Sequence, residues 1–338
     1  MIEIYINDKK YTNIFGDVEW SGSVTQSARI LEFEYKPEEL KLVLGDKVVF
    51  KLDSTKELFY GIVTFIQNNS DGTLNKATAQ DTSFRLNKNR FIKNYFEKFP
   101  SEIVKEICGE LELEVGKLPE DVVKCTFPVI DMSGYEIILS AYTIQHNKDK
   151  KIYSLVSNNG KIDIVEQGVI LEGVELNGKY DIRTAEYSED LERMINQIVI
   201  YKTENNKAQI IDKVANEEDK KRYGVFQDVM KYEEDMNNIF NARDMLKGVE
   251  RTGYITVNGN PNLKSGYRVA VKEEKSGLIG LFIIESDNHY WENGDYSTVL
   301  KLSFENSMNK VELDSALRTM KKEENVEIKR ETNFDLKR

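Results

Sequence analysis

The sequence has few of the residues on which disulfide frameworks, metal sites and thiol catalysis depend. Its 338 residues include two cysteines, Cys108 and Cys125, and two histidines, His146 and His289. Two cysteines exclude a disulfide framework as the main stabiliser, and we expect both to be buried, reduced thiols. Neither histidine has a CxxC, HxxxH or HExxH context, so the sequence predicts no metal site and no cofactor.

The sequence also lacks long apolar runs and an excess of positive charge. No run approaches the roughly 18 apolar residues that span a bilayer. The first residues, Met1–Ile6, alternate like a strand and do not resemble a signal peptide, which predicts a protein made in a cytoplasm, without a standard export signal or a membrane anchor. The formal net charge of −11 disfavours attraction to nucleic acid or to anionic membranes.

Alternating hydrophobicity dominates residues 1–90. Ile2, Ile4 and Ile6 share one face, and the run Leu31–Tyr35 places apolar residues on one face and glutamates on the other. This period of two predicts half-buried strands. Turn residues separate the strands and no helical pattern intervenes, so we predict a first antiparallel β-barrel over 1–90.

Helical patterns follow in residues 91–180, which we predict to form a small α+β domain. One helix is expected to begin with Ser101 as its cap, and a second at Ser133, where Glu136 completes a capping box. The Asn-Gly pair at 159–160 predicts a hairpin between Ile152–Ser157 and Lys161–Val165.

Strand patterns return over 181–305, which predicts a second β-barrel. A long helix is expected inside this barrel's sequence, at about 227–247, with Gly248 as its stop. Residues 306–338 are rich in lysine and glutamate with few apolar residues, which predicts a polar C-terminal tail. The predicted fold class is therefore β-rich α+β, with two barrels, an inserted small α+β domain and a long helix.

The two ends of the chain resemble each other. Strand patterns at Leu44–Leu52 and Leu58–Gln67 recur at Lys264–Val271 and Gly277–Glu285, and a further strand follows each pair. In both, a glycine precedes the first strand and another lies inside or beside the second. This recurrence predicts an internal duplication. The alternative is coincidence, because any meander of short strands joined by glycine turns repeats the same pattern.

A search for catalytic groups finds no convincing set. A cysteine–histidine pair is disfavoured, because Cys108 lies between Glu106 and Glu110 on the apolar face of a predicted helix, where a thiolate is not stabilised. Carboxylates are abundant, but no aromatic cleft brackets a chosen pair. The sequence therefore predicts no catalytic residue and a protein that is not an enzyme.

Aromatic residues are more informative. Trp20 and Trp291 both lie beside glycine turns, where large rings plug a barrel mouth or anchor an interface. With Arg29 and Tyr296, which are close to them in sequence, they are our candidate interface or barrel-mouth residues.

Several segments together resemble the XkdQ-like baseplate hub proteins of contractile phage tails and phage-tail-like (R-type) bacteriocins. The resemblance covers about residues 1–305, and rests on the order and spacing of its segments. These are Val18–Phe33, Leu44–Val48, Leu58–Val63, Ile107–Cys108, Val115–Leu118, Met194–Ile200, Tyr223–Val229, Gly259–Gly266, Gly280–Ile284 and His289–Tyr296.

The resemblance implies a structural protein without catalytic residues, similar to the hub part of type VI secretion spike proteins. It implies a homotrimer whose protomer carries two tail-tube-like barrels, so that three chains form a pseudo-sixfold ring. Such a ring joins the sixfold tail tube protein to the threefold central spike protein, with baseplate wedge proteins and the tape measure protein as further partners. The expected location is the baseplate of a virion or tail-like particle.

Two other classes of function stay open at this stage. One is a cell-wall hydrolase, which would require a pair of acidic residues. The other is a glycan-binding tail module, which would use exposed Trp20 and Trp291. The sequence leaves open whether the particle is a phage or a headless bacteriocin, and what residues 306–338 do.

Overall fold

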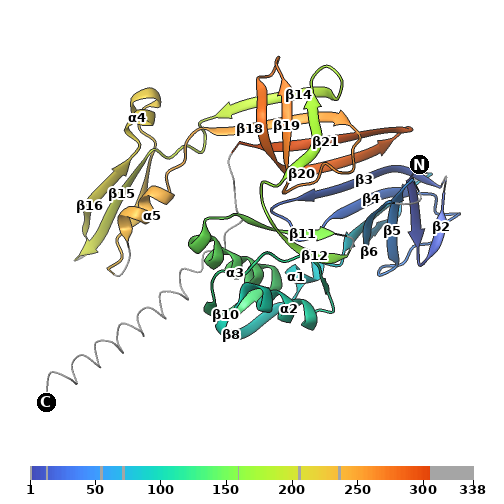
Figure 1. Ribbon diagram of the computed structural model, residues 1–338, viewed down its shortest axis with the longest axis horizontal. Helices are drawn as coiled ribbons and strands as arrows, with labels where there is room; N and C mark the ends of the chain where they lie inside the picture. The colour runs from blue at the N-terminus through green and yellow to red at the C-terminus, as the bar shows by residue number, and fades with distance from the viewer. Residues whose placement is uncertain are drawn as a thin grey trace. The chain divides into compact units, whose positions relative to one another are not determined.

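The structure is a computed structural model that describes residues 2–12, 14–53, 56–70, 73–158, 160–204, 207–234 and 237–304 (Figure 1). The predicted tail over 306–338 lies outside the described residues. The chain divides into two compact units, one of Met1–Ala185 with Tyr254–Arg338 and one of Glu186–Gly253. The larger unit contains two β-units and a small α+β domain.

The first β-unit is a curled antiparallel sheet with its own hydrophobic core. Its core side chains alternate along the strands as predicted, with Leu31, Phe33 and Tyr35 buried. The order of hydrogen-bonded neighbours is β3-β4-β7-β6-β5-β1-β2. The strands are β1 (Ile2–Ile6), β2 (Lys9–Tyr11), β3 (Phe15–Ser23), β4 (Ile30–Tyr35), β5 (Lys47–Leu52), β6 (Lys56–Gln67) and β7 (Asn75–Asp81).

The α+β domain follows with a separate core. The capping box of Ser133 and Glu136 begins α3 as predicted, and the predicted hairpin is formed by β11 and β12. The first long helix, α2, begins at Pro100 after Phe99, one residue before the predicted cap Ser101, because proline is already suited to the first helical position. The elements are α1 (Phe84–Lys88), β8 (Arg90–Lys98), α2 (Pro100–Glu110), β9 (Glu114–Val115), β10 (Cys125–Ser133), α3 (Gly134–Asp149), β11 (Tyr153–Asn158) and β12 (Lys161–Glu166).

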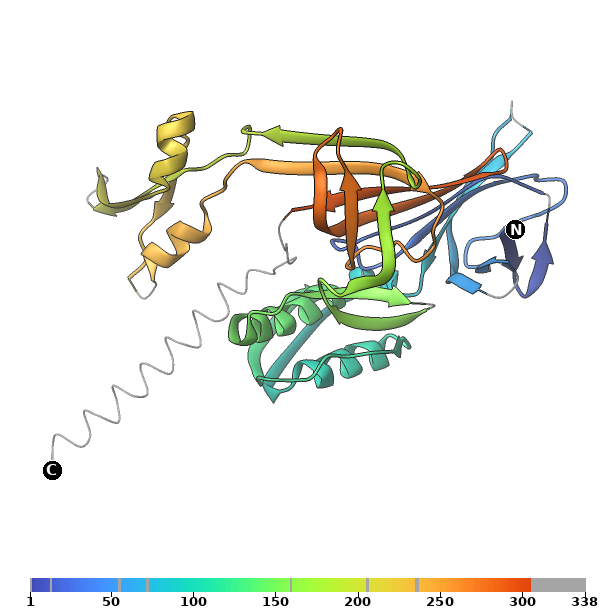
Figure 2. The ribbon, with the colours of Figure 1, turned by 45° about the horizontal axis from the view of Figure 1, so that its top comes forward.

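The second β-unit is built around another core (Figure 2). Its neighbour order is β14-β18-β21-β20-β19-β13. Strand β20 is antiparallel to both β19 and β21, whereas β13 is parallel to β19. The strands are β13 (Ile170–Asn177), β14 (Ile182–Asp190), β18 (Glu250–Asn258), β19 (Arg268–Glu273), β20 (Leu278–Glu292) and β21 (Asp295–Ser303).

The two β-units repeat one strand order. The strands of the two units correspond in chain order: β1 to β13, β3 to β14, β4 to β18, β5 to β19, β6 to β20 and β7 to β21. Each strand has the corresponding neighbours in its own sheet. The correspondence extends to register. Lys47 of β5 pairs with Ile62 of β6, as Arg268 of β19 pairs with Ile283 of β20. A β-bulge follows in each longer strand, between Val63 and Phe65 of β6 and between Ile284 and Ser286 of β20.

The turn before each repeated strand is also the same. Gly45 and Gly266 have φ values of +92° and +91°, a conformation that favours glycine. The Gly45 N–H donates to the Val63 carbonyl at 2.8 Å, and the Gly266 N–H donates to the Ile284 carbonyl at 2.9 Å. The glycines inside the second strands are not equivalent, because the position of Gly61 is occupied by Phe282. One strand departs from the repeat, because β1 is antiparallel to β5 whereas its counterpart β13 is parallel to β19. The strand order, the register that β5–β6 shares with β19–β20, and the turn still support duplication over coincidence.

The smaller unit contains a three-stranded sheet with short helices. The predicted long helix at about 227–247 is wrong: β17 pairs in parallel with β15, and α5 is a short helix capped by Asn237. The predicted apolar positions do not form a buried stripe, since Val229 and Phe240 are exposed. Residues 235–236 of that stretch are outside the described part. The elements are β15 (Gln197–Glu204), β16 (Lys207–Ala215), α4 (Glu217–Tyr223), β17 (Gln227–Lys231) and α5 (Asn238–Asp244).

Candidate functional site

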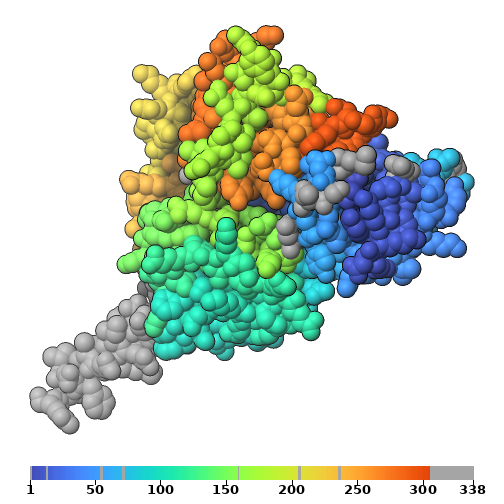
Figure 3. Space-filling model, turned by 45° about the vertical axis from the view of Figure 1, so that its right-hand side comes forward, coloured from blue at the N-terminus to red at the C-terminus, as the bar shows by residue number. Residues whose placement is uncertain are grey.

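The two β-units share one long strand, β20, and the joint between them is the candidate site. The first half of β20 pairs with β19 inside the second β-unit, and its second half pairs with β3 of the first β-unit. Strand β21 pairs with β20 from Ile283 to Glu292, along the second half and the point where the two halves meet. The two β-units therefore form one continuous sheet, and their surfaces adjoin in the space-filling view (Figure 3).

A buried ion pair crosses this joint. Arg29, just before β4, donates to both carboxylate oxygens of Asp287 on β20, and the Ser265 N–H also donates to Asp287 at 2.6 Å. Both side chains are buried. Burial opposes the ionisation of Asp287, but the Arg29 guanidinium and the hydrogen bond from His289 outweigh it and hold the pKa of Asp287 well below its usual range.

His289 extends the polar network toward the second β-unit. Its Nε2 lies 3.1 Å from both the Leu263 carbonyl and an Asp287 oxygen, so Nε2–H is the donor. Its Nδ1 lies 3.0 Å from the Tyr296 hydroxyl and 3.1 Å from that of Thr298, and accepts from them. Burial lowers the pKa of His289, which keeps the ring neutral at pH 7.

Aromatic rings cover the ion pair. The Arg29 guanidinium carbon lies 4.0 Å from the centroid of Trp20, and the Trp20 and His289 centroids are 4.8 Å apart. Trp291 and Tyr296 stack at 4.3 Å. The structure therefore brings together all four candidates from the sequence, Trp20, Arg29, Trp291 and Tyr296, in a joint within one chain. Their role as an interface with another chain stays a prediction.

One alternative from the sequence is wrong at this site. Trp20 is fully buried in the middle of β3, so it is not the exposed ring that a glycan-binding module would use. His289 is buried and lies in strand β20. Asp287, His289 and Trp291 alternate along one side of β20, and this period of two could have predicted a strand at His289. The pattern was hard to recognise because polar residues also lie between them and on the buried side.

Lys264 is a further residue of the joint that sequence reasoning missed. Its ammonium lies 5.2 Å from the centroid of Trp20. Burial, and next the charge of Arg29, lower the pKa of Lys264 to about 8. This lysine belongs to the turn before β19, so that turn packs into the joint.

A cleft of about 980 Å³ opens beside the stacked Trp291 and Tyr296. The carboxylates of Asp17, Asp53 and Asp295 are among its lining groups. Asp295 accepts two hydrogen bonds from Arg183, which lowers the pKa of Asp295 and makes it unsuited to act as a general acid.

Metal-binding and thiol chemistry receive no support from the described residues. Within them, no group of three or more histidine, cysteine, aspartate or glutamate side chains is arranged to hold a metal ion. Cys108 and Cys125 are free and buried as predicted, and burial raises the pKa of each thiol to about 12. None of the described helices is long and apolar enough to span a membrane.

The pH dependence of stability should report on His289. Because its pKa is lower in the folded state than in the unfolded state, its contribution to stability is present above about pH 6.5 and lost as the pH falls through the folded pKa. We expect the melting temperature to fall between pH 7 and pH 5, and to fall less in His289→Gln.

The control for this prediction replaces the other histidine, His146, which contacts the Lys151 carbonyl in the α+β domain. His146→Gln should keep the wild-type pH dependence. Thermal melts at half-unit steps of pH measure both variants, and equal slopes in wild type and His289→Gln would contradict the assignment.

Solved structures with this fold are phage tail and type VI secretion proteins. The 43 kDa tail protein of prophage MuSo2 from Shewanella oneidensis has a TM-score of 0.70 and 13% identity, covering 89% of this chain and 96% of that one. A tail protein from Neisseria meningitidis MC58 has a TM-score of 0.65 and 12% identity, covering 89% and 95%. The E. coli c3393 protein, a type VI secretion component described as similar to the T4 tail proteins gp27 and gp5, has a TM-score of 0.54 and 10% identity, covering 88% and 76%.

The chain thus has the fold of these phage tail and type VI secretion proteins. At the sequence level, the chain is 22% identical to XkdQ of the phage-like element PBSX of Bacillus subtilis, over 91% of this chain and 98% of that protein. It is 24% identical to Bacillus subtilis YqbQ, over 78% and 82%. A model of the YqbQ-like family matches residues 18–303, and the chain belongs to that family. The resemblance to XkdQ-like proteins is confirmed.

Proposed function

We propose that the protein is the hub of a contractile-tail baseplate, a homotrimer that joins the sixfold tail tube to the threefold central spike. The observation that carries this proposal is the repeated strand order of the two β-units, with the same register at the start of β5–β6 and β19–β20 and the same turn before each pair. Two equivalent units in each of three chains present six similar faces, and closed symmetry limits the assembly. We further propose that the two β-units are the tail-tube-like barrels and that the described part of the chain has no catalytic role.

The proposed partners are the tail tube protein, the central spike protein, baseplate wedge proteins and the tape measure protein. The fold shared with the c3393 protein, which is described as similar to the T4 tail proteins gp27 and gp5, supports assembly with other tail proteins. The proposed location is the baseplate of a virion or tail-like particle.

An acidic face on the joint sheet supports a second part of the proposal, a channel that does not retain a polyanion. Asp17, Glu19, Glu32, Glu34 and Glu292 line one groove over β20, β3, β4, β6 and β7, in which Lys76 pairs with Glu34 at 3.2 Å. Burial, and then the charge of Glu32 across the strand pair, raise the pKa of Glu19. We propose that this face lines the bore of the ring, where negative charge repels DNA or an acidic tape protein.

Cryo-electron microscopy of the assembled particle tests the hub proposal. The expected result is three copies in a ring between tube and spike, with the acidic face toward the axis. A position outside the tube–spike axis, or any other copy number, would contradict the hub; a basic or neutral bore would contradict only the channel. The mass of the purified protein with its spike protein gives the stoichiometry independently.

A cell-wall hydrolase is the second candidate, because the 980 Å³ cleft combines aromatic and acidic side chains. Such an enzyme needs a protonated carboxyl as the general acid, and the lowered pKa of Asp295 does not provide one. We expect no clearing in a zymogram of the wild-type protein. Clearing that is lost in Asp17→Asn or Asp53→Asn would replace the structural proposal with an enzymatic one.

A further inference from the structure

The three-stranded sheet of the smaller unit has two sides of different composition. Its neighbour order is β16-β15-β17. On one side, which we call the covered side, Ile198, Ile200 and Val214 form the core of the unit with Ala242 of α5. Side chains alternate along a strand, so Val199 of the central strand β15 belongs to the second side, and it is not part of that core.

The second side carries exposed apolar residues. By register, Val229 of β17 lies beside Val199, and Ile210 of β16 lies beside Tyr201. Val229 is 53% exposed, Ile210 65%, and the adjacent Ile211, at a β-bulge, 43%. Single exposed apolar residues are common on protein surfaces, but a group of them marks an interaction surface.

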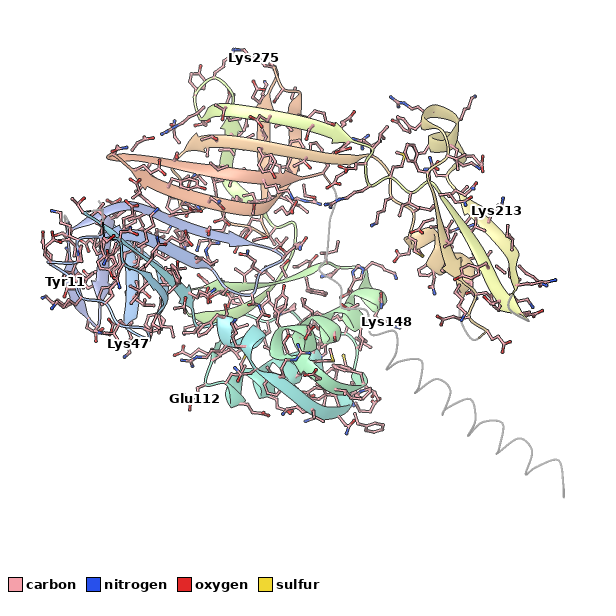
Figure 4. All side chains as sticks on the ribbon, turned by 180° about the vertical axis from the view of Figure 1, so that it is seen from behind. Tyr11, Lys47, Glu112, Lys148, Lys213 and Lys275 are labelled. Atoms are coloured by element: carbon pink, nitrogen blue, oxygen red, sulfur yellow. The ribbon has the colours of Figure 1, made fainter. Side chains whose placement is uncertain are left out.

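Charge is divided between the two sides. Register and alternation place all the acidic residues of the three strands on the covered side; these are Glu204, Asp212 and Asp228. Lys213 and Lys231 belong to the second side, and both are exposed; Lys213 is labelled on β16 in Figure 4. Among the described residues neither lysine forms an ion pair, whereas Lys202 of the covered side pairs with Glu204. We call Ile210, Lys213, Val229 and Lys231 the lysine face.

A hollow at the edge of β16 extends the positive charge of this face. It has a volume of about 450 Å³ and adjoins Lys213. Lys220 and Arg243 also line it, and the carboxylate among its lining residues, Glu217, is paired with Lys220 at 2.9 Å. The hollow therefore adds cations to the margin of the lysine face without adding an unpaired carboxylate.

This composition favours an acidic protein segment over a nucleic acid as the occupant. The chain has a net charge of −11, so a face with two unpaired lysines and no acidic residue differs from the rest of the molecule. A phosphate backbone is bound by positive charge and gains nothing from the apolar side chains of Val229 and Ile210. A protein interface, in contrast, combines an apolar centre with complementary charge at its margin.

We propose that the lysine face binds a segment of a different tail protein, in which apolar residues are flanked by aspartate or glutamate. The apolar residues of that segment contact Val229 and Ile210, and its carboxylates pair with Lys213 and Lys231. This inference rests on the proposed place of the protein in a tail, but it does not depend on the trimer.

Carbodiimide cross-linking of tail particles assembled in the host tests the contact. The reagent activates a carboxylate, and a lysine amine beside it displaces the activating group as a urea and forms an amide, so that a link reports an ion pair. The expected result is a link from Lys213 or Lys231 to an aspartate or glutamate of a different protein, identified by mass spectrometry. Lys221 of α4, which is also exposed, is the internal control and should form no such link.

The possible outcomes separate this inference from the proposed function. Particles that contain the protein but give no link at either lysine, or a link only to another copy of this chain, overturn the docking alone. Particles that lack the protein overturn the proposed function, and the docking with it. If both lysines are protected from acetylation in the particles and nuclease treatment removes the protection, the occupant is a nucleic acid and the proposal is overturned.

A matched pair of variants tests the apolar part of the contact while both lysines are kept. Ile210→Asp should lower the yield of links from Lys213 and Lys231 at least tenfold, because it removes an apolar contact and repels the carboxylates of the partner. Phe240 on α5 is 64% exposed, which matches Ile210, but it lies outside the lysine face. Phe240→Asp should keep the wild-type yield, with thermal melts showing that both variants are folded. Equal yields from the two variants would overturn the proposal.

Discussion

Replacing Asp287 by asparagine is expected to destabilise the protein by about 3–5 kcal/mol, because it leaves the buried guanidinium of Arg29 without a counter-charge. The same change removes the charged acceptor of the Ser265 N–H and of His289. Urea unfolding at pH 7 measures the loss. Since the pKa of Asp287 is lowered in the folded state, its stabilising contribution is fully present above about pH 4 and is lost progressively as the pH falls toward the folded-state pKa, so the difference from wild type should shrink in acid.

The chain offers a matched control in a second Arg–Asp pair. Arg183 binds Asp295 through two hydrogen bonds, but both side chains are substantially exposed. Asp295→Asn should therefore cost far less stability than Asp287→Asn. Equal losses in the two variants would show that burial does not determine the strength of the joint.

Replacing Gly61 by alanine is expected to have the second-largest effect. A Cβ atom at this position of β6 would lie 2.2 Å from the backbone carbonyl oxygen of Gln80 on β7. Backbone atoms of a paired strand cannot move without disturbing the ladder, so we expect a loss of about 1–3 kcal/mol. Thermal and urea unfolding of Gly61→Ala measure it.

Gly109 is the control for the same chemical change. It lies inside α2, and no heavy atom outside its own helix and neighbours is within 4 Å of an added Cβ. Gly109→Ala should stabilise the protein by about 0.5–1 kcal/mol, because alanine loses less backbone entropy in a helix. A stabilising Gly61→Ala would show that β6 and β7 can separate at this position without cost.

Local sequence patterns predicted the elements whose stability comes from neighbouring residues. The capping box of Ser133 and Glu136 depends on residues three apart, and the alternation of Leu31, Phe33 and Tyr35 depends on residues two apart. The stretch at 227–247 was predicted wrongly because its apolar residues fit a helix only loosely, while pairing with β15 stabilises β17 from outside the stretch. Tertiary pairing can override weak local preference.

The sequence by itself determined the β-rich fold class and predicted the duplicated strand pattern, and it singled out as interface or barrel-mouth candidates four residues that the structure places in the joint. Only the tertiary structure decided that Arg29 pairs with Asp287, that His289 is buried beside them, and that the turns equivalent in sequence are buried in one β-unit and exposed in the other. The reason is physical: alternation and turn residues act over a few positions, whereas a buried ion pair joins residues far apart in the chain, and no local pattern encodes which partner compensates a buried charge.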